Sequence, residues 1–276
     1  APLDVAGNIQ LFQEGRTLEI EETRYDADSR TVTIVPQGGL RAGTRYQARI
    51  AAAVGGPLRQ EQGDFLWDFS TRIPSPGSVD PADGDSTGSG VRRLQVTFSG
   101  DLDSDLITLQ NFRLSRSGVS VELDQREFVY DGDTYTVSFP SVDLQPGSEY
   151  QAAVSSRVSG PLGGDRPDLE WTFRTQVPQV VSTWPDDGAD GVSTSAPTLQ
   201  VVFSEPVASQ NASAFQLLAR SLGDTSGAPE LVAITSPTTR DSGDVVVLNF
   251  AAETGLQPFT EYEVTVAREV LGDLAT

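Results

Sequence analysis

The chain has 276 residues with no cysteine, histidine or methionine, and all 19 of its basic residues are arginine. These absences exclude disulfides, thiolate or imidazole metal sites, histidine-based catalytic triads and lysine Schiff bases. Asp and Glu together number 39, so the net charge is −20. This charge disfavours nucleic acid as a partner, because neutralising phosphates needs a basic surface. Carboxylate chemistry, calcium binding and non-catalytic roles remain open.

The acidity has two explanations, which are compatible with each other. One is adaptation to high salt, where screening by ions removes the repulsion between acidic side chains. The other is a GC-rich genome, whose codon bias favours Arg over Lys. With 37% hydrophobic residues, the composition is that of a folded protein. No run of 18 apolar residues occurs, so we expect no membrane-spanning segment.

Alternating apolar and polar residues near the N-terminus predict half-buried β-strands. Residues 1–72, hereafter the first unit, predict strands at 32–34 and 46–50, separated by a turn at Gly38-Gly39. The same pattern continues through residues 73–176, the middle unit.

In the middle unit the alternation predicts strands at 94–98, 135–139 and 150–154. Residues 177–276, the third unit, predict strands at 246–250 and 262–266. Helical character is confined to short stretches such as Ala212 to Leu222, where one or two turns are expected in a connection.

The three units are related by an internal repeat. The segment Trp67–Thr71 returns as Trp171–Thr175 after 104 residues. Tyr46 returns as Tyr150 at the same spacing and as Tyr262 after a further 112 residues. Units of about 100 residues, with short strands and Gly/Pro turns, predict an all-β fold of tandem β-sandwiches. A parallel α/β fold would need longer helices between its strands.

A tyrosine motif strengthens the prediction of sandwiches. The middle unit has Leu-x-Pro-Gly-x-x-Tyr at 144–150, which predicts a tyrosine corner. In such a corner the tyrosine ring packs inside while its hydroxyl bonds backbone a few residues upstream. The first unit keeps the frame at 40–46 with Ala42 in place of proline, and the third keeps it at 256–262 with Phe259 in place of glycine.

Five motifs follow one another in the middle unit. They are Pro-x-Asp-Gly at 81–84, Phe-Ser at 98–99, Asn-Phe-x-Leu at 111–114, the tyrosine motif at 144–150, and Trp-x-Phe-x-Thr at 171–175. This order resembles bacterial Ig-like domains of the S-layer (SbsA-like) type. The resemblance implies tandem Ig-like sandwiches, and non-catalytic modules of secreted surface proteins. It implies no catalytic residue.

The repeat predicts that only the middle unit (73–176) is a complete sandwich. Phe98 precedes Tyr150 by 52 residues, so the first unit (1–72) lacks its first strands. The counterpart of Trp171 would fall near position 283, so the third unit (177–276) lacks its last strand. The chain is then either a window of a longer array or one that exchanges strands with neighbouring copies, because open sandwich edges favour strand addition.

Three aspartate clusters are candidates for calcium. They are Asp80, Asp83 and Asp85 at the first linker, Asp186, Asp187 and Asp190 at the second, and the alternating Asp101, Asp103 and Asp105. Calcium takes six to eight oxygen ligands, which clustered carboxylates supply. Against this, Pro-x-Asp-Gly is common turn chemistry, and the third cluster has the pattern of a solvated strand end. We therefore predict no metal, cofactor or catalytic residues, with calcium at the acidic linkers as the alternative.

The tryptophans are predicted to have structural roles. Trp67 and Trp171 alternate with phenylalanines and are expected in the cores. Trp184 replaces the aspartate of the previous unit beside the second linker, so it is expected to pack between units rather than stack on carbohydrate.

The third unit has seven extra residues between Phe203 and Tyr262, placed at 221–229 or 236–243. A glycoside hydrolase would need a cleft that holds two acids about 5–10 Å apart. Compact sandwiches with short loops offer little room for such a cleft, so no enzyme activity is expected.

The sequence thus predicts a non-catalytic structural or assembly segment of a secreted bacterial surface protein, of the S-layer, stalk or filament type. Its location would be extracellular or on the cell surface, and its partners neighbouring Ig-like domains or copies of itself, joined in one version by strand complementation. The alternative is an adhesin, or a glycan- or partner-binding module, of a larger exported protein.

Overall fold

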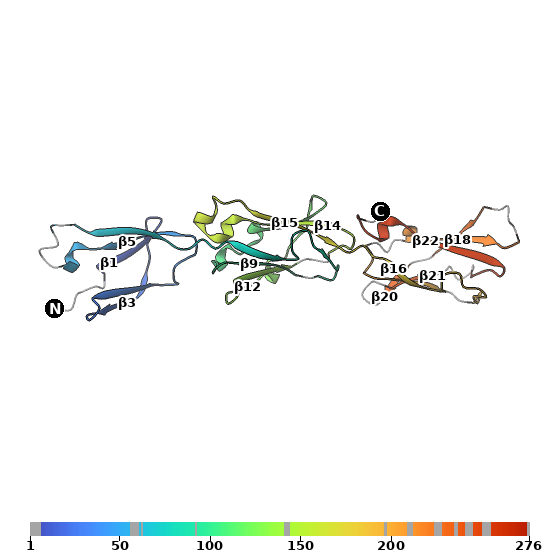
Figure 1. Ribbon diagram of the computed structural model, residues 1–276, viewed down its shortest axis with the longest axis horizontal. Coiled ribbons are helices and arrows are strands. Elements are labelled where there is room, and N and C mark those ends of the chain that lie inside the picture. Colours follow the sequence, from blue (N-terminus) through green and yellow to red (C-terminus); the bar gives the residue numbers. More distant parts are fainter. Residues whose placement is uncertain are drawn as a thin grey trace.

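The structure, a computed structural model, is all-β, which confirms the predicted fold class. Paired sheets follow one another along the long axis of the molecule (Figure 1). The helical elements among the described residues are short 3-10 turns. The structure describes residues 7–55, 61, 63–91, 93–140, 144–195, 198–208, 212–223, 228–234, 237–240, 245–249 and 255–274.

The first unit has a four-stranded sheet in the order β2-β1-β5-β6 and a two-stranded sheet of β3 and β4. The bounds are β1 (Ile9–Gln13), β2 (Arg16–Thr17), β3 (Ile20–Asp26), β4 (Thr31–Pro36), β5 (Arg45–Ile50), η1 (Ala52–Gly55) and β6 (Phe65–Ser70). All of its strand pairs are antiparallel.

The middle unit has a five-stranded sheet, β11-β10-β14-β15-β8, and a four-stranded sheet, β12-β13-β9-β7. Its strands are β7 (Pro76–Asp80), β8 (Ser86–Thr87), β9 (Arg93–Phe98), β10 (Phe112–Arg116), β11 (Val119–Ser120), β12 (Val129–Asp131), β13 (Thr136–Pro140), β14 (Glu149–Val154) and β15 (Leu169–Thr175). Its 3-10 turns are η2 (Ser104–Leu106), η3 (Leu109–Asn111), η4 (Gln125–Glu127), η5 (Ser156–Ser159) and η6 (Pro161–Gly163). The pair of β8 and β15 is parallel.

The third unit has a four-stranded sheet, β16-β17-β21-β20, and a three-stranded sheet, β19-β18-β22. The bounds are β16 (Val180–Trp184), β17 (Thr198–Phe203), η7 (Ala212–Ala214), β18 (Phe215–Ser221), β19 (Glu230–Val232), β20 (Thr238–Arg240), β21 (Val245–Asn249), β22 (Thr260–Val266) and η9 (Arg268–Val270).

The core of the middle unit lies between its two sheets and follows from the alternation in the sequence. Every second residue of β9 and β15 is buried. Phe139 on one sheet packs edge-on against Trp171 on the other, with ring centroids 6.3 Å apart. Tyr150 stacks on Phe173 at 5.4 Å within the larger sheet. A period of two in the sequence therefore becomes two apolar faces pressed together.

The first unit corrects one prediction. Trp67 was expected in the core, but 37% of it is exposed, against 3% for its counterpart Trp171. The strand β13 pairs with both β12 and β9, whereas its counterpart β4 pairs only with β3 among the described residues. No described strands of the first unit correspond to β7 and β9, so the face that contains Trp67 is left uncovered.

A second prediction was wrong in the third unit. One or two helical turns were expected within Ala212 to Leu222; one short turn, η7, is present, but residues 215–221 form β18. β18 pairs along its whole length with β22, and this tertiary pairing outweighs the local preference. The extra residues of this unit lie in the connection from β18 to β19, which confirms the first of the two predicted positions.

Candidate functional site

Each unit contains the predicted tyrosine corner. The hydroxyl oxygens of Tyr46, Tyr150 and Tyr262 accept hydrogen bonds from the backbone N–H groups five residues upstream, at 2.7, 2.7 and 2.6 Å. A second bond fixes the same turn in two units. The N–H of Gly43 donates to the carbonyl of Arg72 (2.9 Å), and the N–H of Gly147 donates to that of Gln176 (2.8 Å). These bonds tie the turn to the linker that leaves the unit.

The glycine of the corner turn is the point where the first unit meets the middle unit. Gly43 has a φ of 54°, and its carbonyl accepts the N–H of Leu162 at 2.8 Å. A Cβ on Gly43 would lie 2.0 Å from the carbonyl oxygen of Ser159, and one on Gly160 would lie 2.2 Å from that of Ala42. Only glycine fits at either position, because the two backbones are in direct contact.

The middle and third units meet through the same arrangement. Gly147 has a φ of 56°, and its carbonyl accepts the N–H of Leu274 at 2.7 Å. A Cβ on Gly147 would lie 2.2 Å from the carbonyl oxygen of Leu271, and one on Gly272 would lie 2.1 Å from that of Pro146. We call this arrangement the glycine interlock: a corner glycine, a glycine of the next unit, and the backbone bond between the units. Both junctions of the described chain contain it.

Side chains add polar contacts at the junctions, and these differ between the two. At the first junction Arg41 bridges Asp103 (3.2 Å) and Asp105 (3.3 Å). At the second junction the hydroxyl of Ser117 donates to Asp273 at 3.4 Å. The backbone interlock is therefore common to the junctions, while the ion pairs of Arg41 belong to the first junction.

A further contact spans the second junction. The carboxylate of Glu205 in the third unit accepts both the N–H and the hydroxyl of Ser89 in the middle unit, each at 3.2 Å. Each junction thus combines close backbone contact with one or more contacts made by a carboxylate.

In the first and middle units, an aspartate carboxylate holds a 3-10 turn. In the middle unit this turn, η5, contains Ser159 and precedes Gly160 of the interlock. Asp168 accepts the N–H of Ser156 at 2.9 Å and pairs with Arg113, and both interactions lower the pKa of this carboxyl, the backbone bond most. Asp64 accepts the N–H of Ala52 at 3.0 Å, and this bond, with the hydrogen bond from Arg49, lowers its pKa too. The carboxylate form is favoured because it accepts these bonds.

The predicted aspartate clusters are dispersed among protein partners. Asp83 accepts the N–H and hydroxyl of Thr172 at 2.8 and 3.3 Å, and Asp85 accepts the N–H of Ala82 at 3.3 Å. The bond to Asp85 is a local turn contact, as in the turn chemistry that was weighed against calcium, whereas Asp83 reaches across to β15. Within the described ranges, no three acidic side chains gather in a way that could hold a metal ion.

The third cluster corrects the sequence interpretation. It is not a solvated strand end, because Asp103 begins η2 and its side chain is only 11% exposed beside Arg41. Asp101 turns elsewhere and accepts the hydroxyl of Tyr130. This hydrogen bond adds to burial, and together they raise the pKa of Tyr130 to about 12. The cluster therefore divides between a junction and a core edge.

The structure places Trp184 away from the second junction. β16 begins at Val180, next to the linker, and Trp184 ends it, half exposed. The expected packing of this side chain between units was therefore wrong. Asp186, Asp187 and Asp190, which the sequence assigned to the second linker, follow β16 inside the third unit and are exposed.

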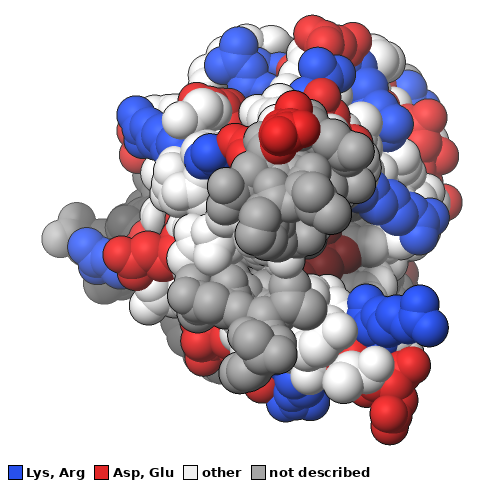
Figure 2. Space-filling view, turned by 90° about the vertical axis from the view of Figure 1, so that its left-hand side faces the viewer, with Lys and Arg blue, Asp and Glu red and all other residues white. Residues whose placement is uncertain are grey.

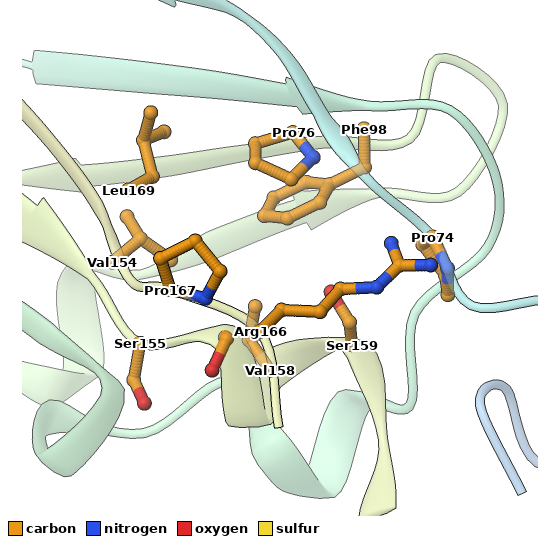
Figure 3. Close-up of a pocket in the computed structure, with 11 residues that line it drawn as sticks. Pro74, Pro76, Phe98, Val154, Ser155, Val158, Ser159, Arg166, Pro167 and Leu169 are labelled. Carbon is orange, nitrogen blue, oxygen red and sulfur yellow. The ribbon is translucent and has the colours of Figure 1, made fainter. Parts of the chain in front are cut away.

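The middle unit contains two hollows. The first, of about 30 Å³, lies between apolar side chains including Pro76, Phe98 and Val154, with Arg166 reaching toward Pro74 (Figure 3). This volume suits one or two water molecules and is far below that of a ligand pocket. The second is an open polar hollow of about 370 Å³, lined in part by Arg113, Arg157 and Arg166.

Figure 2 shows acidic and basic side chains interspersed over the end of the molecule formed by the first unit, where residues are described. In the described residues, no helix is long and apolar enough to cross a membrane.

The sequence analysis missed the receiving half of the interlock. It is a Val-x-Gly-x-Leu motif at 158–162 that returns at 270–274, after 112 residues. The valines at both places are buried and anchor the loop in its unit. The spacing of 112 residues is the one that relates Tyr150 to Tyr262, so the same self-comparison could have revealed this motif.

The comparisons with known proteins bear on the fold. Residues 174–276 match a protein-family model. That family is the bacterial Ig-like domain. The match agrees with the resemblance in its coarser form, and the sandwich sheets of the structure are consistent with it. No curated protein matches the chain.

Several solved structures are remotely similar to the chain. The N-terminal part of the bacterial S-layer protein SbsC is 16% identical over 72% of this chain and 42% of its own, with a TM-score of 0.28. The chain thus spans less than half of that structure. The LD transpeptidase LdtMt1 in complex with imipenem is 19% identical over 59% of this chain and 74% of its own, also at 0.28. Native alpha-2-macroglobulin from Escherichia coli is 12% identical over 96% of this chain and 88% of its own, with a TM-score of 0.28.

Proposed function

We propose that this chain is a non-catalytic structural segment of a secreted bacterial surface protein, in which Ig-like sandwiches are held in line as a stiff spacer. The S-layer, stalk and filament types are the settings in which such a segment would act. The match of residues 174–276 to a bacterial Ig-like domain supports a bacterial origin for the fold.

The observation on which the proposal rests is the glycine interlock. Flexible linkers would leave the units free to rotate, and relative motion is the usual expectation for small interfaces between domains. Here the linker residues Arg72 and Gln176 are bonded back to the corner turns, and the next unit bonds to the same glycines. Because the contact is made by backbone at both junctions, it supports a fixed orientation of the units.

Small-angle X-ray scattering of the full chain tests the proposal. We expect scattering that fits one extended arrangement of units at both low and high salt, since the interlock itself has no charged groups. Scattering that requires an ensemble of bent and straight chains would contradict the spacer role. Negative-stain images recorded with and without calcium would then reveal whether such rods assemble into filaments or lattices.

The uncovered face of the first unit supports a further part of this proposal. Phe65 and Trp67 lie on one face of β6 with their rings 5.6 Å apart and are 54% and 37% exposed, and covering strands would bury such a face. Either a segment of the same polypeptide or a strand from a neighbouring copy would supply the cover. Native mass spectrometry separates them: a mass above that of one chain supports exchange, and a single-chain mass contradicts exchange as the means of assembly.

A second candidate is a binding module for acidic glycans, favoured by the polar hollow of the middle unit. Its three arginines stand out on a chain of net charge −20, and Arg113 pairs there with Asp168. Titration calorimetry with sulfated and neutral oligosaccharides tests this candidate. Binding of the sulfated form alone, lost in an Arg157→Gln/Arg166→Gln variant, would support it, and equal heats for both would exclude it.

A further inference from the structure

The corner turn of the third unit departs from the other two at the residue that forms the interlock. Phe259 occupies the position of Gly43 and Gly147, and with a φ of 55° it has the same backbone conformation. The turn is otherwise intact, since the hydroxyl of Tyr262 accepts the N–H of Gln257 at 2.6 Å. The phenylalanine is 83% exposed. The left-handed conformation favours glycine, so a bulky residue there is unusual.

Phenylalanine at this position is incompatible with the interlock. A Cβ alone on Gly43 or Gly147 would lie 2.0 or 2.2 Å from a carbonyl oxygen of the next unit. That oxygen belongs to backbone, which cannot move aside without displacing the unit to which it belongs. A following unit could therefore not approach Phe259 in the register seen at the two junctions.

The backbone of the third turn also has a different partner. At the junctions the glycine carbonyl accepts an N–H of the next unit, from Leu162 or Leu274. In the third unit the carbonyl of Phe259 accepts the N–H of Leu222 at 2.9 Å, from within the same unit. Leu222 thus takes the place that a leucine of the next unit takes elsewhere.

The extra residues of the third unit explain how Leu222 reaches this place. In the middle unit β10 ends in a two-residue hairpin turn at Ser117-Gly118, whose φ angles of 48° and 79° fit a type I′ turn. In the third unit the corresponding strand, β18, continues to Ser221, which pairs with Thr260. The longer hairpin therefore extends the sheet up to Phe259 and places Leu222 over its carbonyl.

The two ends of the described chain also differ in sequence. Residues 54–58 of the first unit read Val-Gly-Gly-Pro-Leu and keep the Val-x-Gly-x-Leu motif. In the middle and third units this motif contacts the corner turn of the preceding unit. The corner glycine is present in the first and middle units and is replaced by Phe259 in the third. The first unit therefore has the residues for an interlock on both of its sides, whereas the third has them only on the side that faces the middle unit.

We propose that the third unit is a closing unit. It docks onto the middle unit through Gly272, but Phe259 and Leu222, which follows the longer strand β18, close its own corner turn to any following Ig-like unit with a Val-x-Gly-x-Leu loop. A segment that follows would join without the interlock, and the rod would end or become hinged there. The inference rests on the proposed spacer function, because it states where the fixed spacing stops.

Hydrogen exchange in the full chain, measured by NMR, tests the closure through three leucine amides. In the unaltered chain we expect the amides of Leu162, Leu222 and Leu274 all to be protected. The variant Gly147→Phe transfers the closing residue to the middle unit. It should reduce protection of Leu274 at least tenfold and leave Leu162 and Leu222 unchanged.

Distances between units provide the second measurement. The chain has no cysteine, so Glu122→Cys and Glu263→Cys, both exposed, accept spin labels uniquely. Gly147→Phe should broaden the distance distribution between them. Gly188→Phe is the matched control, because Gly188 has a φ of 74° but open space where a Cβ would lie. Gly272→Ala changes the other side of the junction and should also broaden the distribution, even if Gly147→Phe disturbs the middle unit itself.

Two results would overturn the closure. One is a narrow distribution together with a protected Leu274 in both Gly147→Phe and Gly272→Ala. The other is rapid exchange of Leu222 in the unaltered chain. Either could occur while scattering still fits a stiff rod, so failure of the closing unit is distinguishable from failure of the spacer function.

Discussion

The first and middle units place the same tryptophan in different surroundings. Trp67 and Trp171 lie in corresponding strands, β6 and β15, and each pairs across to an alanine of the neighbouring strand. Yet Trp171 is buried against Phe139, whereas Trp67 is open to solvent. The difference shows that alternation along one strand selects the face of a side chain, while burial depends on the sheet opposite.

The largest expected difference between the units comes from truncating these tryptophans. Trp171→Ala should destabilise the middle unit by about 3–5 kcal/mol, because it empties a packed core position. Trp67→Ala should cost roughly 1 kcal/mol, as at partly exposed sites. Exchange protection of β13 and of β5, followed in urea, reports each unit separately, which matters because several units need not unfold together.

Trp171→Phe is the informative control for this comparison. The indole Nε1 is buried and has no hydrogen-bond partner in the described structure. Removing it should therefore cost far less than removing the ring. Equal losses for Trp171→Ala and Trp67→Ala would instead mean that the first unit is covered in solution.

The tyrosine corners should respond equally in the two units, in contrast to the tryptophans. Tyr46→Phe and Tyr150→Phe each remove one hydroxyl acceptor and leave a backbone N–H unpaired, at a cost of about 1 kcal/mol. The hydroxyl bonds are equally long, at 2.7 Å. Urea midpoints, followed by amide exchange of Ala48 and Ala152, measure the loss of stability in each unit. A loss in one unit more than twice that in the other would contradict the equivalence.

A smaller effect should distinguish the two junctions. Asp103→Asn removes a charged partner of Arg41 at the first junction, worth at most about 1 kcal/mol because Arg41 is half exposed. Spin labels at Thr33→Cys and Glu122→Cys should show a broader distribution in the variant at low salt. High salt should broaden the distance distribution of the unaltered chain toward that of the variant, because it screens the ion pair. Broadening at the second junction would contradict this assignment.

The smallest expected effect is the loss of stability at low pH. Folding lowers the pKa values of Asp64 and Asp168, so the stability that they contribute is present above the unfolded pKa, near 4. It is lost as the pH falls through the lower folded pKa. Thermal unfolding between pH 5 and 2 should therefore show a shallower decline in Asp168→Asn than in the unaltered chain. Parallel curves would indicate that this carboxylate is not coupled to folding.

Most of the fold was predictable because a period of two is a local property. The strands around Val96, Val137 and Ala152 were predicted from alternation, and the tyrosine corners from one short motif. The stretch from Ala212 to Leu222 was not, because pairing of β18 with β22 decided its conformation. Local preference gives way where a partner strand supplies the hydrogen bonds of the backbone.

The junctions were only half predictable. The sequence marked the corner turns and the replacement of glycine by Phe259, but not the loops that meet them. Likewise Asp103 was assigned to a solvated strand end, although Arg41, sixty-two residues away, is its partner. Contacts between units join residues that no local pattern relates.

By itself the sequence determined the all-β class, the repeat of about 100 residues and the turn chemistry, because each depends on residues close together in the chain. Only the tertiary structure decided that Gly43 and Gly147 face glycines of the next unit, that Trp67 is open, and that Leu222 bonds to the third turn. The physical reason is that each of these depends on which surfaces are brought into contact.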